Sequence, residues 1–334
     1  MGKFYYIYMK SLELDLSKKL RLDKVRDSFL FLCNTGLRFE DMFSTRGMLR
    51  WFACCALPLF CVAANAQLTI EADVIYGRKD GMALTYDVLK PENANGAAVI
   101  FMMSGGWYSS WSPPERVALR FADLLEAGFT VIPLYHGSAP RYKIPDAVND
   151  VNLATLHIKS HATEYGVDPD RIGVTGGSAG GHLSLMVGLA SEQVQAAAAT
   201  TEGELDVSLG AIVAYFPPVD FREEEATAAG IVNEVSQEEL YSRFPALIFD
   251  EDLIPAVSPI TYVDPTDPPT LLIHGDADPL VHISHSVAMS EELKSNNIES
   301  DFLVIEGGKH GFRRENSAIA DSARLAWFKK HLLD

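Results

Sequence analysis

The chain has 334 residues, of which 48% are hydrophobic, and its formal net charge at pH 7 is −17. This length and apolar content suit one large or two small domains with a packed core. The acidic balance disfavours nucleic-acid binding, because a surface that follows phosphates needs clustered lysine and arginine side chains. It also predicts weak attraction to anionic lipid or anionic polysaccharide.

A secretory signal peptide is predicted at residues 48–66. Arg46 and Arg50 precede an apolar run of 14 residues, 51–64, and Ala64-Asn65-Ala66 resembles a cleavage site. The run is shorter than the ~20 residues of a membrane-spanning helix. We therefore expect export to the periplasm or cell exterior, with no membrane span after cleavage near Ala66. Residues 1–47 then come from a start codon assigned too far upstream or, as the alternative, form a cytoplasmic extension.

Strand-like and helix-like segments alternate from residue 67 onward, which predicts a single α/β domain over 67–334 with a doubly wound, mostly parallel sheet. The first two strands alternate in polarity, as an antiparallel pair with one solvated face would. The next six are apolar on both faces, which is typical of parallel strands covered by helices. The expected strands are 68–77, 83–90, 97–103, 129–135, 171–177, 209–216, 270–275 and 301–307. The expected helices are 114–127, 145–165, 178–189, 285–295 and 316–333.

One connection is far longer than the others. About fifty residues, 217–269, separate the sixth and seventh expected strands, and they are rich in acidic residues and proline. A connection of this length is usually functional or mobile. It predicts either a solvated surface excursion or a small cap insertion that covers a substrate.

Two glycines, Gly105 and Gly106, directly follow the third expected strand. A hairpin turn, a phosphate-binding loop and an oxyanion hole can all begin this way. A hairpin is disfavoured within a parallel sheet, and a phosphate loop would carry a G-K-[S/T] signature that is missing here. The glycines therefore favour an oxyanion hole. Aromatic residues that line a substrate, or that simply pack, follow at Trp107, Tyr108 and Trp111.

The strongest local motif is Gly176-Gly177-Ser178-Ala179-Gly180, which fits G-x-S-x-G. A buried strand precedes it and a helix follows, which predicts a sharp turn that exposes the Ser178 side chain above the sheet. The helix N-terminus adds N–H groups that favour a developing oxyanion. A turn of small residues with no chemical role is the alternative, and it is disfavoured by the strand and the helix on either side.

An acid and a base follow Ser178 in the order that this type of site requires, Ser, Asp or Glu, then His. Asp276 and Asp278 follow the seventh strand, and His310 follows the eighth. Spacing alone leaves both aspartates open. The histidine at 136 is expected near the rim of the site, whereas those at 182 and 274 are expected to make structural hydrogen bonds.

A metal site is disfavoured in the segment between residues 274 and 285. The candidate ligands lie on a strand end, a loop and a helix start instead of one helical face. We expect no metal here. The residues considered are His274, Asp276, Asp278, His282 and His285.

Taken together, these motifs resemble the α/β-hydrolases, and among them the carboxylesterases similar to hormone-sensitive lipase and feruloyl-esterase-like proteins. The resemblance covers Leu68 to Leu333 and rests on "EYGVDPDRIGVTGGSAGG", "GGSAGGH", "SPITYVDPTDPPTLLIHGDADPLV" and "GGKHGF". It implies Asp278 as the acid and His310 as the base. Such esterases carry H-G-G-G-W where this chain has Met103-Ser104-Gly105-Gly106-Trp107, so a loop-bracing histidine is replaced by Met103.

The resemblance implies a serine hydrolase that cleaves carboxylic esters through an acyl-enzyme on Ser178, with no cofactor. Its oxyanion hole would consist of the N–H groups of Gly105, Gly106 and Ala179. The expected substrates are short-acyl or aryl esters, or acyl groups on polysaccharides. The alternatives are a serine exopeptidase of the prolyl-oligopeptidase type, an acyltransferase and a non-catalytic binding module. The last is disfavoured because no member of the triad is missing.

Overall fold

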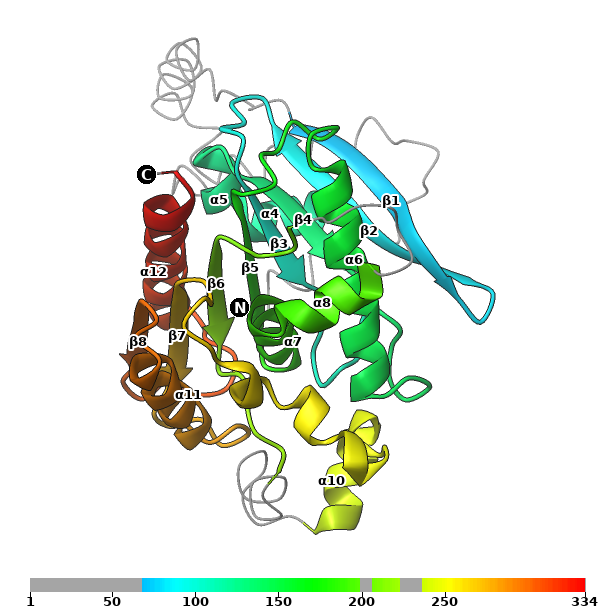
Figure 1. Cartoon of the computed structure of the whole chain (residues 1–334). Helices are drawn as coiled ribbons and strands as arrows, with labels where there is room; N and C mark the ends of the chain where they lie inside the picture. The colour runs from blue at the N-terminus through cyan, green and yellow to red at the C-terminus, as the bar shows by residue number, and fades with distance from the viewer. Residues whose placement is uncertain (1–67, 199–205, 223–235, 334) are drawn as a thin grey trace, which may run out of the picture. The chain divides into compact units, whose positions relative to one another are not determined.

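The computed structural model describes residues 68–198, 206–222 and 236–333 (Figure 1). These described residues form one compact unit. The predicted N-terminal extension, 1–47, and the predicted signal peptide, 48–66, lie outside the described residues. No helix in the described part of the chain combines the length and the apolar character that crossing a membrane requires.

Eight strands form one sheet in the order β1-β2-β4-β3-β5-β6-β7-β8. The β1 and β2 strands pair antiparallel, β2 pairs antiparallel with β4, and the remaining neighbours are parallel. This confirms the predicted doubly wound, mostly parallel α/β class. The strands are β1 (Leu68–Lys79), β2 (Met82–Pro91), β3 (Ala98–Met102), β4 (Thr130–Leu134), β5 (Ile172–Gly177), β6 (Ala211–Tyr215), β7 (Thr270–Gly275) and β8 (Ser300–Ile305).

Helices cover both faces of the sheet (Figure 1). One core cluster contains side chains of α6, α7, α8 and α11, and a second contains side chains of α4, α5 and α12. The central strands are buried on both faces because they lie between these two layers. The helices are α4 (Pro114–Arg120), α5 (Ala122–Glu126), α6 (Ile144–His161), α7 (Ala179–Leu189), α8 (Ser191–Ala198), α10 (Gln237–Arg243), α11 (Ser284–Ser295) and α12 (Glu315–Leu332).

Two predicted elements differ from those observed. The helix expected over 114–127 is divided at Phe121, which leaves the helical region at φ −114° and ψ 29°. Its ring is fully buried and lies 4.5 Å from that of Phe101, so core packing takes precedence over helix continuity. The last strand, β8, is an edge strand and is not buried on both faces, since Val304 is 45% exposed.

The long connection packs onto the domain in its described parts, 217–222 and 236–269. The second part contains α10 and four short 3-10 helices, η3 (Pro245–Leu247), η4 (Glu251–Leu253), η5 (Pro255–Val257) and η6 (Pro259–Tyr262). Leu240, Leu247 and Val257 belong to the same core cluster as α6 and α7. This part is therefore bound to the domain through apolar contacts. Residues 223–235 of the predicted cap lie outside the described residues.

The parallel strands bring separate loops to one edge of the sheet. The strands β3, β5, β6, β7 and β8 run in the same direction, so the loops that follow them share the edge formed by their carboxyl ends. These loops carry the double glycine, Ser178, the two aspartates and His310. The fold thus gathers residues that lie more than 200 positions apart in the sequence.

Candidate active site

Ser178 lies in a strained turn between β5 and α7, with φ 56° and ψ −121°. The flanking glycines permit this turn. A Cβ atom on Gly176 would lie 2.4 Å from the carbonyl carbon of Gly180, and one on Gly180 would lie 2.9 Å from the Met102 carbonyl oxygen. The Ser178 N–H donates to the Tyr215 carbonyl at 2.9 Å, which ties the turn to β6. The sharp strand-to-helix turn is as predicted, and half-buried Ser178 stands at its apex.

His310 is hydrogen-bonded to Asp278, with 2.8 Å between Nδ1 and Oδ2. The Asp278 side chain is fully buried, and its Oδ1 accepts the N–H groups of Leu280 at 2.8 Å and Val281 at 3.1 Å. Asp276 is exposed and accepts the Gly307 N–H at 2.6 Å. Geometry therefore distinguishes the two aspartates, which sequence spacing could not, and it pairs the histidine with Asp278.

Asp278 is held in its charged form. Burial raises the pKa of its carboxyl group, but hydrogen bonds from His274 and His310, together with the charge of His310, outweigh burial and place the pKa below the usual 3.8. A carboxylate can only accept hydrogen bonds. His310 Nδ1 therefore carries the hydrogen toward Asp278, and in the neutral ring Nε2 is left with its lone pair.

An aromatic residue missed by the sequence analysis connects the serine turn and the histidine. The Phe216 ring lies 4.5 Å from the His310 ring, centre to centre, and 3.2 Å from the position of a Cβ on Gly177. Its backbone has φ 37°. The sequence signal that could have identified Phe216 is its position directly after β6, at the sheet edge that carries the other candidate residues. Its side chain therefore packs against both the residue before Ser178 and the base.

The double glycine begins a tight turn inside the loop after β3. The β3 strand pairs parallel with both β4 and β5, so no hairpin joins core strands here, as predicted. Gly105 and Tyr108 exchange two backbone hydrogen bonds of 3.0 Å, and φ is 58° at Gly106 and 60° at Trp107. Positive φ at both central residues is typical of two-residue hairpin turns. Parallel strands restrict only the connections between strands, so this turn fits within a loop.

The turn changes the predicted oxyanion hole. The N–H of Gly105 donates to the Tyr108 carbonyl, so the prediction for Gly105 is corrected: its N–H is occupied. Within the described ranges, the N–H groups of Gly106 and Ala179 donate to no other residue. These two groups are the remaining candidates.

The three aromatic residues after the double glycine separate into different environments. Trp107 is 3% exposed and donates from Nε1 to His182 Nδ1 at 3.3 Å. It packs in the core, so its predicted substrate-lining position is corrected. Trp111 is 60% exposed and does not line the neighbouring pocket, whereas Tyr108 does.

The loop that lacks the expected histidine at 103 is braced from the adjacent strand. His136 follows β4 and makes a 2.8 Å hydrogen bond between Nε2 and the Ser104 hydroxyl. Its Nδ1 lies 2.9 Å from the Gly137 carbonyl, which can only accept, so Nδ1 donates and Nε2 accepts from Ser104. Ser109 also donates to the Met103 carbonyl at 2.8 Å. The predicted rim histidine is thus 5% exposed and holds the loop in place.

Acid is expected to destabilise the protein through His136. Burial lowers the pKa of His136 from 6.5 to about 4. Between these values the unfolded chain binds a proton that the folded chain does not, so the unfolding free energy falls as pH falls. The loss is up to about 1.4 kcal/mol per pH unit. Urea titrations from pH 7 to 4 measure how the unfolding free energy depends on pH. For His136→Asn this dependence should be weaker by the contribution of one proton. Equal slopes would contradict this assignment.

His182 and His274 make structural hydrogen bonds, as predicted. His182 Nε2 lies 2.7 Å from the Val257 carbonyl, and His274 lies 2.8 Å from the Ser286 hydroxyl and 2.9 Å from the Val281 carbonyl. His282 bonds to Ser284. Among the described residues, no three His, Cys, Asp or Glu side chains are arranged to hold a metal ion.

A pocket of about 440 Å³ reaches Gly177, next to Ser178 in the chain. Its wall includes the loop after β3 and Gly177, the residue before Ser178. The lining residues include Met103, Ser104, Gly105, Tyr108, Gly177 and Phe216.

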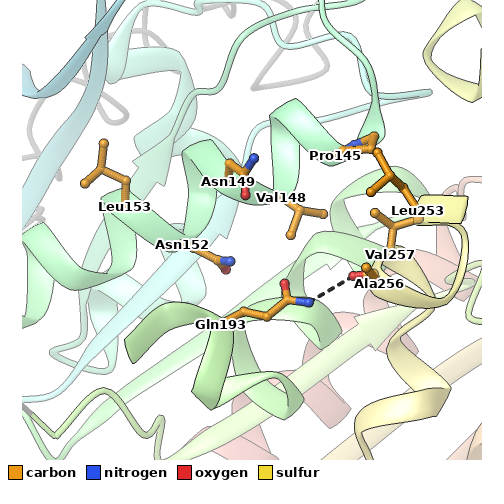
Figure 2. A pocket seen from close by; sticks show the side chains of 9 residues that line it. All are labelled: Pro145, Val148, Asn149, Asn152, Leu153, Gln193, Leu253, Ala256 and Val257. Atoms are coloured by element: carbon orange, nitrogen blue, oxygen red, sulfur yellow. Dashed lines mark hydrogen bonds between the residues drawn. The ribbon is translucent and has the colours of Figure 1, made fainter. Parts of the chain in front are cut away.

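A larger hollow of about 610 Å³ lies among α6, α8, η4 and η5. Figure 2 shows its apolar and amide side chains, with Gln193 donating to the Ala256 carbonyl at 3.0 Å. It contains no nucleophile, acid or base. The pocket beside Ser178 is therefore the candidate active site.

Several proteins named as esterases are similar to this chain in sequence or structure. A probable carboxylic ester hydrolase of Mycobacterium tuberculosis, LipM, is 27% identical over 71% of this chain and 54% of its own length. The chain thus spans about half the length of this relative. A truncated carbohydrate esterase from gut microbiota is 26% identical, covers 81% of this chain and 99% of its own, and has a TM-score of 0.63. Apo esterase 2 of Thermogutta terrifontis, 23% identical with coverages of 81% and 94% and a TM-score of 0.61, shares the fold.

The family profile named BD-FAE matches residues 86–293. The match begins in β2 and ends in α11, so it includes the serine turn and Asp278 but not His310. Together with the sheet order and the esterase folds that resemble it, this match shows that the chain belongs to the BD-FAE family and has the α/β-hydrolase fold.

Proposed function

We propose that this chain hydrolyses carboxylic esters through an acyl-enzyme on Ser178. The observation that carries the proposal is the hydrogen-bonded Asp278–His310 pair at the same sheet edge as the strained Ser178 turn. The relatives named as ester hydrolases support ester substrates. The gut relative is named a carbohydrate esterase, which supports polysaccharide-linked acyl groups as one substrate class. The signal predicted at 48–66 supports export.

The mechanism uses the turn that presents Ser178 and the hydrogen-bonded Asp278–His310 pair. Ser178 Oγ attacks the ester carbonyl while His310 Nε2 accepts its proton, and Asp278 stabilises the imidazolium that forms. The N–H groups of Gly106 and Ala179 receive the oxyanion, at the N-terminus of α7. His310 then gives the proton to the leaving alcohol. Water, deprotonated by the same histidine, releases the acid and restores Ser178.

A substrate panel tests the proposal. The protein is assayed on para-nitrophenyl esters of increasing acyl length, on an acetylated polysaccharide and on aminoacyl para-nitroanilides. We expect turnover of the esters, with short acyl groups preferred because the pocket holds only about 440 Å³, and no turnover of the anilides.

Three other outcomes would contradict it. Anilide turnover without ester turnover would identify a peptidase. Acyl transfer to an added alcohol in preference to water would identify an acyltransferase. Absence of both turnover and fluorophosphonate labelling at Ser178 would identify a binding module.

A further inference from the structure

One charged side chain lines the pocket beside Ser178. Arg120 ends α4, and its guanidinium carbon lies 4.5 Å from the centre of the Phe101 ring. Among the described residues that form the pocket wall, Arg120 is the only charged one. The same wall includes Gly105, next to the candidate oxyanion donor Gly106, and Gly177, which precedes the serine. A positive charge therefore shares one small cavity with Gly177, the residue directly before the candidate nucleophile.

The guanidinium of Arg120 has no carboxylate partner in the described part of the chain. It contacts the faces of Phe101 and Phe121, at 4.5 and 5.4 Å. A neighbouring arginine, Arg324, is ion-paired with Asp123 at 2.8 Å. Contact with a ring engages the plane of a guanidinium. The Arg120 side chain is exposed, so the N–H donors on its edge are open to solvent or to a ligand.

The surrounding charges do not neutralise Arg120. Desolvation, followed by repulsion from Arg324, lowers the pKa of Arg120 below the usual 12.5, and attraction to Asp321 only partly offsets this. Asp321 is itself ion-paired with Arg324 at 3.2 Å. An arginine stays protonated in proteins. The chain has a net charge of −17, but the charged residue on the pocket wall is positive. The pocket is therefore suited to bind an anion.

We propose that Arg120 binds a carboxylate carried by the ester substrate. The inference rests on the proposed ester hydrolysis at Ser178 and narrows its substrates to esters with a free acid group. The planar guanidinium matches a carboxylate through two parallel hydrogen bonds. Tyr108 and Ser110 line the same pocket and supply hydroxyl groups. The acid belongs either to the acyl part, as in a half-ester of a dicarboxylic acid, or to the alcohol part, as in an ester of a hydroxy acid.

Two pairs of substrates show whether the carboxylate belongs to the acyl part or to the alcohol part. The first pair is para-nitrophenyl hydrogen adipate and the neutral methyl para-nitrophenyl adipate, which differ in a charge on the acyl part. The second pair is para-acetoxybenzoate and its methyl ester, which differ in a charge on the alcohol part. We expect the wild-type protein to have the higher kcat/KM for the charged member of one pair, and that pair identifies the part of the substrate in the pocket.

Variants on one helix test whether Arg120 causes the preference. Arg120→Gln should lower the ratio of kcat/KM for the charged and neutral members by about 10- to 100-fold, the effect of losing a charge-assisted hydrogen-bonded pair. Arg116→Gln removes an exposed charge one turn earlier on α4 and should leave the ratio unchanged. If Arg120→Gln unfolds, Arg120→Lys retains the charge without the paired geometry and should still lower the ratio.

The outcomes distinguish this inference from the function on which it rests. Turnover of the neutral esters with no preference for a charged member overturns the role of Arg120 and leaves the esterase proposal intact. If no ester is hydrolysed, the esterase proposal fails, and binding is then measured with adipate alone. Adipate should raise the Tm of the wild-type protein and not that of Arg120→Gln. If adipate raises the Tm of both proteins equally, or of neither, the proposal that Arg120 forms an anion site is overturned.

Discussion

Replacement of Ser178 by alanine should lower kcat for ester hydrolysis by about a million-fold, while the protein stays folded. Removal of the nucleophile leaves His310 without a proton to accept and prevents formation of the acyl-enzyme, and loss of the serine alone removes most of the benefit of such a triad. The measurement is kcat on para-nitrophenyl acetate, with circular dichroism and Tm to confirm folding. Mass spectrometry of the fluorophosphonate-treated protein provides a second readout.

The matched control is Ser160→Ala, an exposed serine near the end of α6. It should retain wild-type kcat and label to the same extent as the wild-type protein. Ester turnover that survives in purified Ser178→Ala would show that another group attacks the substrate. A label found on a peptide without Ser178 would lead to the same conclusion.

Asp278→Asn should lower kcat by about 10,000-fold with little change in KM. An asparagine at this position can present an N–H to the ring, which stabilises the histidine tautomer with hydrogen on Nε2, and that tautomer cannot accept the serine proton. The effect should therefore be on the chemical step. Steady-state kinetics of the folded variant on para-nitrophenyl acetate, across pH 5 to 9, provide the measurement.

Asp276→Asn is the internal control for this prediction. Asp276 lies two residues away in the same loop, but its Oδ1 accepts the Gly307 N–H at 2.6 Å and makes no bond to the histidine. An asparagine oxygen can accept the same hydrogen bond, so kcat should change far less. Equal losses in the two variants would contradict the assignment of Asp278 as the orienting acid.

Local sequence patterns were sufficient for the strands and the serine turn. Residues 98–102 are apolar throughout, residues 130–134 are apolar after Thr130, and both segments form fully buried strands, because continuous apolar runs are stable only when both faces are covered. The turn at Ser178 was predictable since the glycines around it leave room for backbone contacts that a Cβ would prevent. Such features depend on residues within a few positions of one another.

Long-range contacts decided the details that the sequence analysis left open or predicted wrongly. Trp107 was expected to line the substrate, but it bonds to His182, 75 residues later, and is buried. The brace on Ser104 comes from His136, 32 residues away. Neither pair has a local signature, because each partner lies in a different loop or helix and meets the other only when the sheet is assembled.

By itself, the sequence determined the α/β class, the position of the serine turn, and the aspartates and histidine that could complete a triad. The tertiary structure alone decided that His310 pairs with Asp278 and not with Asp276, that the Gly105 N–H is occupied within a turn, and that Arg120 faces the pocket. The physical reason is that backbone patterns follow from neighbouring residues, whereas hydrogen-bond partners and pocket charges depend on which strand ends the fold places side by side.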